Sequence, residues 1–172
     1  FSIQQISVTP DRAKVATFSD VYYQSDKAVI ALPYSTVAGA KSFADLKQAR
    51  WGVAVGTTDF DYVTNVLGID NAAVYDDQAG VFQALQGGQI DATIAALPTA
   101  LYATAVQVPE AKITALLPKD PKDEGLALLF ASGNPIVPWI NEGLAAIRDS
   151  GKIDELVQKY LVADPNIPVI NE

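Results

Sequence analysis

Short apolar runs alternate with helical segments between residues 51 and 116, and this alternation constrains the fold more than any other feature of the chain. Four runs have the length of strands and cover residues 51–55, 72–75, 90–97 and 112–116. Three predicted helices separate them: one opens at a capping box at Thr58 and ends near Leu67, one is capped by Asp77 and stops at Gly87, and one covers about 98–106. This order requires crossover connections, and it predicts an α/β fold in which helices cover both faces of a parallel sheet.

Two helices and two further strands are predicted outside this region. Apolar residues at helical spacing predict one amphipathic helix over about 152–162 and another over 138–149. Gly151 stands where a left-handed residue ends the helix before it. The apolar runs Lys27–Leu32 and Leu126–Ala131 bracket the alternating region, and we expect them to form the two arms of a hinge.

The residue types that are missing exclude several classes of chemistry. The 172 residues include no cysteine and no histidine. Disulfides, thiolate or imidazole metal sites, iron–sulfur clusters, and catalysis by a cysteine or a Ser-His-Asp triad are therefore excluded. Twelve basic against twenty acidic residues give a net charge of −8, the wrong sign for binding a phosphate backbone. We expect no cofactor, no metal and no nucleic-acid partner.

A first candidate site follows the strand predicted at 51–55. Gly56 allows a close turn, and Thr57 and Thr58 then present hydroxyls and amides at the start of a helix, where an anion is favoured. The spacing matches neither a phosphate loop nor a dinucleotide fingerprint. A plain helix cap is the alternative interpretation.

A second candidate site lies near the start of the chain. Ser7 and Thr9 alternate on an extended segment and face the same way. Thr9 and Pro10 make an N-cap and a first turn, which hold Arg12 close to both hydroxyls. The planar guanidinium makes this group a carboxylate clamp, with a solvated surface arginine as the alternative.

Five motifs in order along the chain resemble one family. They are QQISVTPDR at 4–12, FSDVYY at 18–23, GTT at 56–58, ALQGGQIDA with LPTALY at 84–102, and IRDSGKIDEL at 147–156. In type, spacing and order they resemble the extracytoplasmic solute-binding proteins of polar amino-acid ABC importers, the family 3 solute-binding proteins.

The resemblance implies a type II periplasmic-binding-protein-like fold with two α/β lobes and mostly parallel sheets. It implies that residues 1–26 belong to lobe 1, that 27–125 form a complete lobe 2, and that 126–172 are the return hinge and the C-terminal helices of lobe 1. The family has an N-terminal stretch before the motif at Gln4. We therefore expect lobe 1 to be incomplete in this chain, and the chain to self-associate through its unpaired strand edges.

The resemblance also implies roles for single residues. Arg12 holds the ligand carboxylate, Ser7 and Thr9 touch the ligand, and the segment from Gly56 to Thr58 (with Thr57) brings donors from the facing lobe. Family members that hold an α-ammonium have an Asp just before the LPTA motif, where this chain has Ala96. Either the ligand lacks an ammonium there, or another carboxylate reaches it, and Asp59 and Asp20 are the nearest in sequence.

The implied function is capture of a small carboxylate, an amino acid first, in the periplasm or at the cell surface, for delivery to the membrane permease of an ABC importer. No catalysis is expected. One alternative is a ligand-sensing module of a receptor. Another is a dehydratase acting on a cyclic carboxylate, with Asp20, Asp59 or Asp91 as its acid or base, although Asp91 is more typical of a structural residue.

Overall fold

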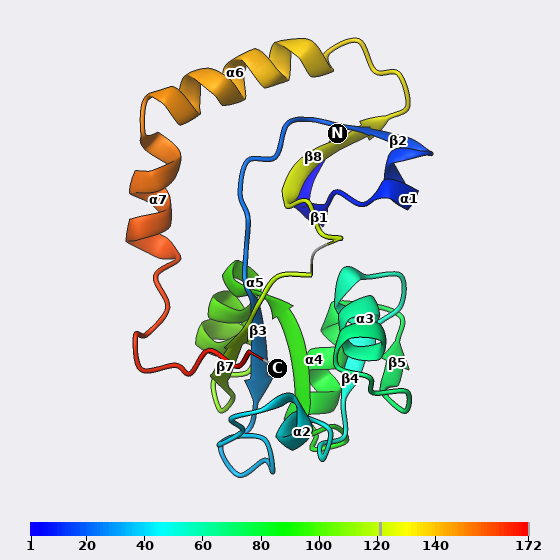
Figure 1. The fold of residues 1–172 in the computed structure, drawn as a ribbon, viewed down its shortest axis with the longest axis vertical. Helices are drawn as coiled ribbons and strands as arrows, with labels where there is room; N and C mark the ends of the chain where they lie inside the picture. The colour runs from blue at the N-terminus through cyan, green and yellow to red at the C-terminus, as the bar shows by residue number, and fades with distance from the viewer. Residues whose placement is uncertain (121, 172) are drawn as a thin grey trace. The chain divides into compact units, whose positions relative to one another are not determined.

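The computed structural model describes residues 1–120 and 122–171, which fold into two compact units (Figure 1). Unit 1 combines Phe1–Ser25 with Pro121–Val162, and unit 2 combines Asp26–Asp120 with Ala163–Glu172.

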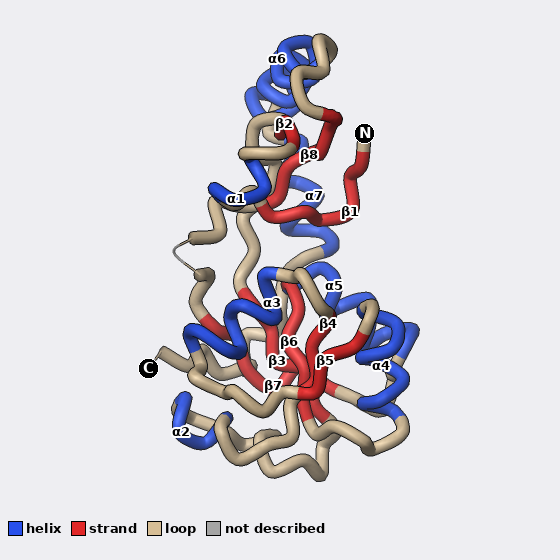
Figure 2. The backbone as a smooth tube through the Cα atoms, turned by 90° about the vertical axis from the view of Figure 1, so that its right-hand side faces the viewer, coloured by secondary structure: helices blue, strands red, loops and turns tan. Residues whose placement is uncertain are grey.

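Unit 2 is built on a sheet with the strand order β5-β4-β6-β3-β7 (Figure 2). Its strands are β3 (Lys27–Ala31), β4 (Gly52–Ala54), β5 (Ala73–Tyr75), β6 (Ala92–Ala96) and β7 (Lys112–Leu117). β4 pairs with β5 in parallel, and a parallel bridge between Trp51 and Ala92 joins this pair to β6. β3 runs antiparallel to both β6 and β7.

The four strands predicted from the alternating region therefore all run in one direction, as expected. The prediction of mostly parallel sheets is nevertheless wrong, because β3 is inserted antiparallel between β6 and β7. Lys27–Leu32, expected to be a hinge arm, lies in the sheet of unit 2 as β3, an interior strand between β6 and β7; its role as a hinge stays a prediction. Its residues occupy that place because they are apolar on both sides of the strand. Val29 and Ala31 face one core cluster, while Ala28 and Ile30 face the other.

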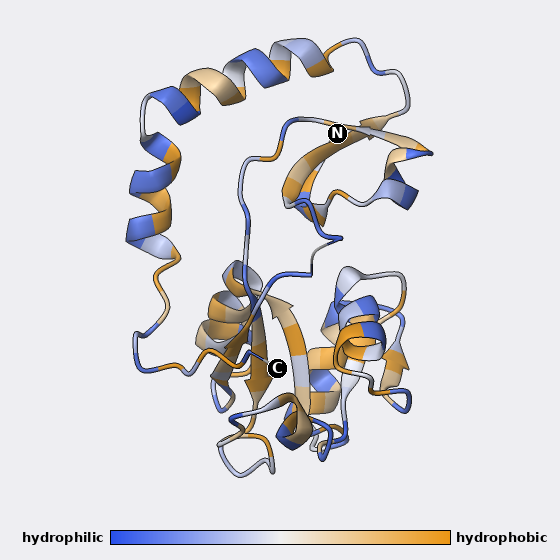
Figure 3. Cartoon of the chain, in the orientation of Figure 1, coloured by the Kyte–Doolittle hydropathy of each residue, from blue (hydrophilic) through white to orange (hydrophobic). Residues whose placement is uncertain are grey.

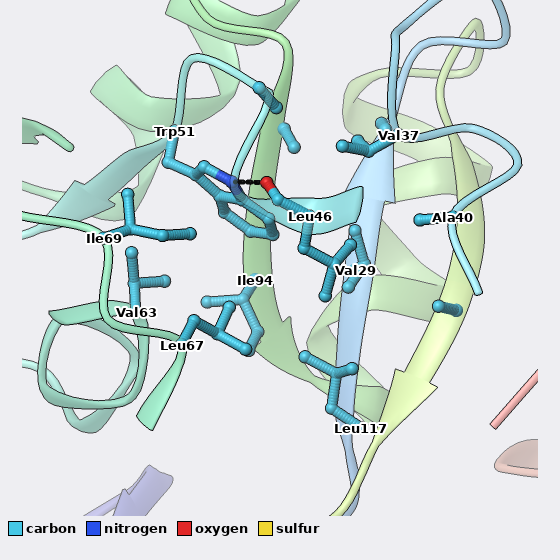
Figure 4. Close-up of a cluster of buried hydrophobic side chains, with 14 of the residues drawn as sticks. Val29, Val37, Ala40, Leu46, Trp51, Val63, Leu67, Ile69, Ile94 and Leu117 are labelled. Carbon is cyan, nitrogen blue, oxygen red and sulfur yellow. Dashed lines mark hydrogen bonds between the residues drawn. The ribbon is translucent and has the colours of Figure 1, made fainter. Parts of the chain in front are cut away.

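Helices cover both faces of this sheet, as the sequence predicts. One face packs against α2 (Phe43–Leu46), α3 (Thr58–Asp61) and the π-helical turn Tyr62–Val66 that continues α3. The other packs against α4 (Gln78–Gln86), α5 (Leu97–Tyr102) and the π-helical turn Ala103–Gln107. At the centre of the first face, the indole nitrogen of Trp51 donates to the carbonyl of Leu46 at 2.7 Å (Figure 4).

Residues 163–171 belong to unit 2, whereas the resemblance places them with the C-terminal helices of lobe 1. Leu116 of β7 donates to the carbonyl of Pro168 and accepts from the amide of Ile170, both at 2.9 Å. Ile170 is 1% exposed and completes the core cluster below α2 and α3. Burial of this one side chain, together with two backbone bonds, explains why the tail returns to unit 2.

Unit 1 holds the antiparallel sheet β1-β8-β2, built from β1 (Ser2–Ser7), β2 (Ala16–Phe18) and β8 (Leu126–Ala131). β8, predicted as a hinge arm, is the central strand. A short helix α1 (Pro10–Ala13) joins β1 to β2, with Thr9 as its N-cap as predicted. Figure 3 shows β8 as an apolar strand, in the same colours as β3 of unit 2.

The two predicted C-terminal helices of unit 1 are α6 (Val137–Asp149) and α7 (Lys152–Tyr160). Gly151 between them has the expected left-handed conformation, with φ at +71°. Val137, Ile140 and Leu144 of α6 pack on Leu128 and Phe130 of β8. No residue of α7 is buried, and Tyr160 is 61% exposed. Self-association of the chain stays a prediction.

Gly125 should be among the least replaceable residues of unit 1. Its φ is +120°, and an added Cβ would lie 2.6 Å from Val21 Cγ1 and 3.1 Å from the carbonyl oxygen of Tyr23. We expect Gly125→Ala to lower the free energy of unfolding by at least about 2 kcal/mol in chemical denaturation. Gly133→Ala is the control, because its φ is +72° but no atom lies within 4 Å; it should cost about 1 kcal/mol. Equal costs would contradict the crowding argument.

Tyr62 should make unit 2 sensitive to alkaline pH. The side chain is 1% exposed and donates to the carbonyl of Pro118 at 2.8 Å. Burial first, and the charge of Asp120 second, raise the pKa of Tyr62 to about 12. Because the folded pKa lies above the unfolded value near 10, this stability is complete below pH 10 and is lost as the pH rises toward 12.

We expect the free energy of unfolding to fall by about 2 kcal/mol across that window through Tyr62 alone. The difference between parent and Tyr62→Phe in denaturation curves at each pH measures it. Tyr102→Phe is the control, because Tyr102 is 57% exposed. In this variant the free energy of unfolding should depend on pH as it does in the parent. A Tyr62→Phe curve parallel to that of the parent would overturn the assignment.

Candidate functional site

Ser7, Thr9 and Arg12 form one group in unit 1, as their spacing predicts. Nη1 of Arg12 donates to the backbone carbonyl of Ser7 at 2.9 Å. The hydroxyl of Thr9 accepts from the backbone amide of Arg12 at 3.3 Å. Two local contacts therefore position this arginine: the cap places its backbone at the start of α1, and the end of β1 orients its guanidinium.

Asp123 also belongs to this group, and the sequence analysis missed it. Its Oδ2 accepts a 2.7 Å hydrogen bond from the hydroxyl of Ser7, which is 4% exposed. Its Oδ1 accepts from the amide of Gly125 at 2.9 Å. Asp123 is more than a hundred residues from Ser7 in sequence, so no local spacing could have revealed the pair.

Gly56, Thr57 and Thr58 follow β4 in unit 2. Gly56 turns the chain with φ at +69°. The N-cap of α3 is Thr57, whose hydroxyl accepts from the amide of Phe60 at 3.1 Å and donates to the carbonyl of Ala54 at 2.8 Å. The capping box predicted at Thr58 is therefore wrong by one residue. Since Thr57 caps the helix, Thr58 lies within its first turn.

A buried lysine joins the second group, and this is the largest departure from the sequence analysis. Lys27 begins β3 and is 3% exposed. Its ammonium donates to the hydroxyl of Thr58 at 3.0 Å and forms an ion pair with Oδ1 of Asp59 at 2.7 Å. The Asp59 side chain is itself only 16% exposed. The one signal in the sequence was a lysine at the head of an otherwise apolar run.

Asp20, the other carboxylate considered for an ammonium, lies in unit 1. Its Oδ1 accepts from the side-chain amide of Asn141 at 3.0 Å, and its backbone amide donates to the same side chain at 2.9 Å. These bonds fasten the chain after β2 to α6. The predicted site residues thus fall into a unit 1 group with Asp20 beside α6, and a unit 2 group around Lys27.

Asp91 has a structural role, as the sequence indicates. Its carboxylate accepts from Nε and Nη2 of Arg50 at 3.0 and 2.7 Å, and from the backbone amide of Arg50 at 2.9 Å. The side-chain bond from Arg50 is the main cause that lowers the pKa of Asp91. The pair ties the start of β6 to the start of β4.

Residues 1–120 and 122–171 contain neither a cluster that could hold a metal ion nor a membrane-spanning helix. The described side chains include no cluster of three or more acidic residues able to hold a metal ion. Among the helices of the same residues, none is both long and apolar enough to cross a bilayer.

Comparison with known proteins assigns this α/β arrangement to the class of two-lobe binding proteins. The sequence profile of the bacterial extracellular solute-binding proteins, family 3, matches residues 1–163. The ABC transporter arginine-binding protein 1 of Escherichia coli (strain K12) is 27% identical over 162 residues, which cover 92% of this chain and 64% of that protein. The glutamine-binding protein GlnH of Bacillus subtilis (strain 168) is 26% identical over 165 residues, covering 95% of this chain and 58% of GlnH.

A solved structure agrees with these relatives. An ancestral arginine-binding protein, bound to arginine, is 26% identical and superimposes with a TM-score of 0.70, covering 91% of this chain and 69% of that one. The chain belongs to the bacterial extracellular solute-binding proteins of family 3, and its fold is that of type II periplasmic binding proteins. It spans less than two thirds of the length of the two curated relatives.

Removal of Lys27 should destabilise unit 2 by leaving the Asp59 carboxylate without its partner. We expect Lys27→Met to lower the free energy of unfolding by about 3 kcal/mol in urea denaturation. The double variant Lys27→Met/Asp59→Asn carries no uncompensated charge and should recover most of this loss. Equal losses in the single and double variants would mean that packing of the lysine stem, rather than charge, matters here.

Proposed function

We propose that the protein captures a small carboxylate solute, an amino acid or a close relative of one, and delivers it to the permease of an ABC importer. The observation that carries the proposal is Arg12, which two local contacts position at the end of β1. A guanidinium held in one orientation loses less entropy when it binds a carboxylate through two parallel hydrogen bonds. Membership of the solute-binding family supports the same conclusion, as do the relatives named for arginine and glutamine.

In this proposal units 1 and 2 correspond to the two lobes of the family, and each unit carries candidate ligand contacts of its own. Arg12 takes the carboxylate of the ligand, and the buried Ser7 with its partner Asp123 supports the strand end beside it. In unit 2, Thr58 lies in the first turn of α3, after the turn at Gly56. The family resemblance implies that ligand binding favours closure of the lobes.

We propose further that the protein is not an enzyme. The three carboxylates considered for a dehydratase already have partners that serve other purposes. Asp91 ties β4 to β6, Asp59 compensates Lys27, and Asp20 binds Asn141. A general acid or base must exchange a proton with the substrate, and none of these arrangements favours that role. The protein would then bind its solute outside the cytoplasm, as the family's name indicates.

Replacement of Arg12 tests this function. Calorimetry on the full-length protein, with a panel of L-amino acids and their 2-hydroxy acids, identifies the acid that binds most tightly. We expect Arg12→Ala to raise the dissociation constant of that acid by roughly a hundredfold, or about 3 kcal/mol. The melting temperature should change little, because Arg12 is only half-buried and makes local contacts.

Arg148→Ala is the matched control. Arg148 is another unit 1 arginine that donates to a backbone carbonyl, that of Val21 at 2.9 Å. This variant should bind the same acid as the parent does. If Arg12→Ala also bound the acid as tightly as the parent does, the assignment of Arg12 as the carboxylate-binding residue would be wrong. If the parent bound no acid of the panel, carboxylate capture itself would be wrong.

A further inference from the structure

The chain passes between the two units three times, and the first two passages form a pair. In unit 1 these passages meet at an antiparallel bridge between Tyr23 and Leu126. In unit 2 the first enters at Lys27 and the second leaves after Leu117, and these two residues are cross-strand partners in β3 and β7. Two neighbouring extended segments can bend together, so on their own they allow the units to rotate as a hinge does.

The third passage leads from α7 into the C-terminal tail, residues 163–171. The amide of Leu161 donates to the carbonyl of Val157 at 2.8 Å, so Leu161 is still bonded to α7. Ala163 already packs against a core cluster of unit 2. The two peptide links from Leu161 to Ala163 span at most about 7 Å. The end of α7 is therefore tied closely to unit 2, however the two units are arranged.

The tail is fastened along the edge of β7 that faces away from β3. At its start, Oδ1 of Asp164 accepts from the amide and the side-chain nitrogen of Asn166 at 2.9 and 2.8 Å, which closes a turn. The tail then runs parallel to β7, as Figure 1 shows, and Leu116 bonds to both Pro168 and Ile170. Because the turn and the strand pairing fix its path, the tail holds little slack.

One side chain secures the end of the tail. Ile170 is 1% exposed and belongs to a core cluster of unit 2, whereas its neighbour Val169 is 61% exposed. A single substitution at Ile170 should therefore release the tail. The family profile matches residues 1–163, so most of the tail lies beyond the matched region.

We propose that the C-terminal tail is a strap that limits how far the two units can separate. A hinge of two adjacent segments leaves the opening free, whereas a third short connection fixes a second point on each unit. The strap acts whether or not a solute is bound. The inference therefore goes beyond the proposed function and rests on the connectivity of the chain.

Distances between spin labels, measured by pulsed electron paramagnetic resonance without ligand, test the strap in the full-length protein. The chain contains no cysteine, so Glu142→Cys on α6 and Gln48→Cys after α2 place one label on each unit. The decisive variant inserts ten Gly/Ser residues between Val162 and Ala163. It leaves Ile170 in its place and adds about 17 Å of flexible chain. We expect the longest distances to increase by roughly 10 Å or more.

Three further variants complete the test. The same ten residues inserted between Asp70 and Asn71, in an exposed turn of unit 2, are the control and should leave the distances unchanged. Ile170→Asp should release the tail and lengthen the distances as the first insertion does. Val169→Asp adds the same charge at an exposed neighbour and should behave like the parent. Should Ile170→Asp fail to fold, the two insertions decide the question.

The outcomes are independent of the proposed function. Equal distances in the parent and in the variant lengthened before Ala163 would overturn the strap, and carboxylate capture would still stand. The strap would be wrong as well if both insertions lengthened the distances alike, because the effect would then not depend on the third passage. Longer distances in the variant lengthened before Ala163 alone would support it, even if Arg12→Ala bound every acid as the parent does.

Discussion

Burial of β3 on both of its faces is the constraint on which unit 2 depends. A strand with apolar side chains on both faces cannot lie at the edge of a sheet, so it pairs with β6 on one side and β7 on the other. That position carries Lys27, the first residue of the strand, into the protein interior. A buried ammonium without a partner costs several kcal/mol, and the pairing with Asp59 offsets this cost. The position of β3 in the sheet therefore brings the ammonium of Lys27 beside Asp59 of α3, and the two form an ion pair.

The two groups of candidate residues are built on different physical principles. In unit 1, Arg12 is half-buried and is held by the N-cap of α1 and by the carbonyl of Ser7. In unit 2, the buried ammonium of Lys27 pairs with Asp59 and donates to the hydroxyl of Thr58.

Local signals in the sequence predicted the elements well and the pairings less well. The N-caps at Thr9 and Asp77 and the left-handed Gly151 follow from local chemistry, and the structure confirms them. The place of β3 depends on which strands it pairs with, and a run of five apolar residues suits a hinge arm and an interior strand equally. The ion pair of Lys27 with Asp59 and the hydrogen bond of Ser7 to Asp123 join distant parts of the chain. Spacing in one sequence carries no information about such contacts.

The chain leaves unit 2 at residue 120 and returns to it at residue 163, and this has a consequence for the order of folding. Nearly all of unit 2 lies in one continuous stretch, so its sheet can form while the later part of the chain is still being made. Unit 1 must instead wait for β8, because both of its edge strands precede that partner by more than a hundred residues. Closing so long a loop is slow, and the strands synthesised first would be the last to find their sheet. Ile170 would then pack against a core that had formed earlier, so the C-terminal tail would join unit 2 late in folding.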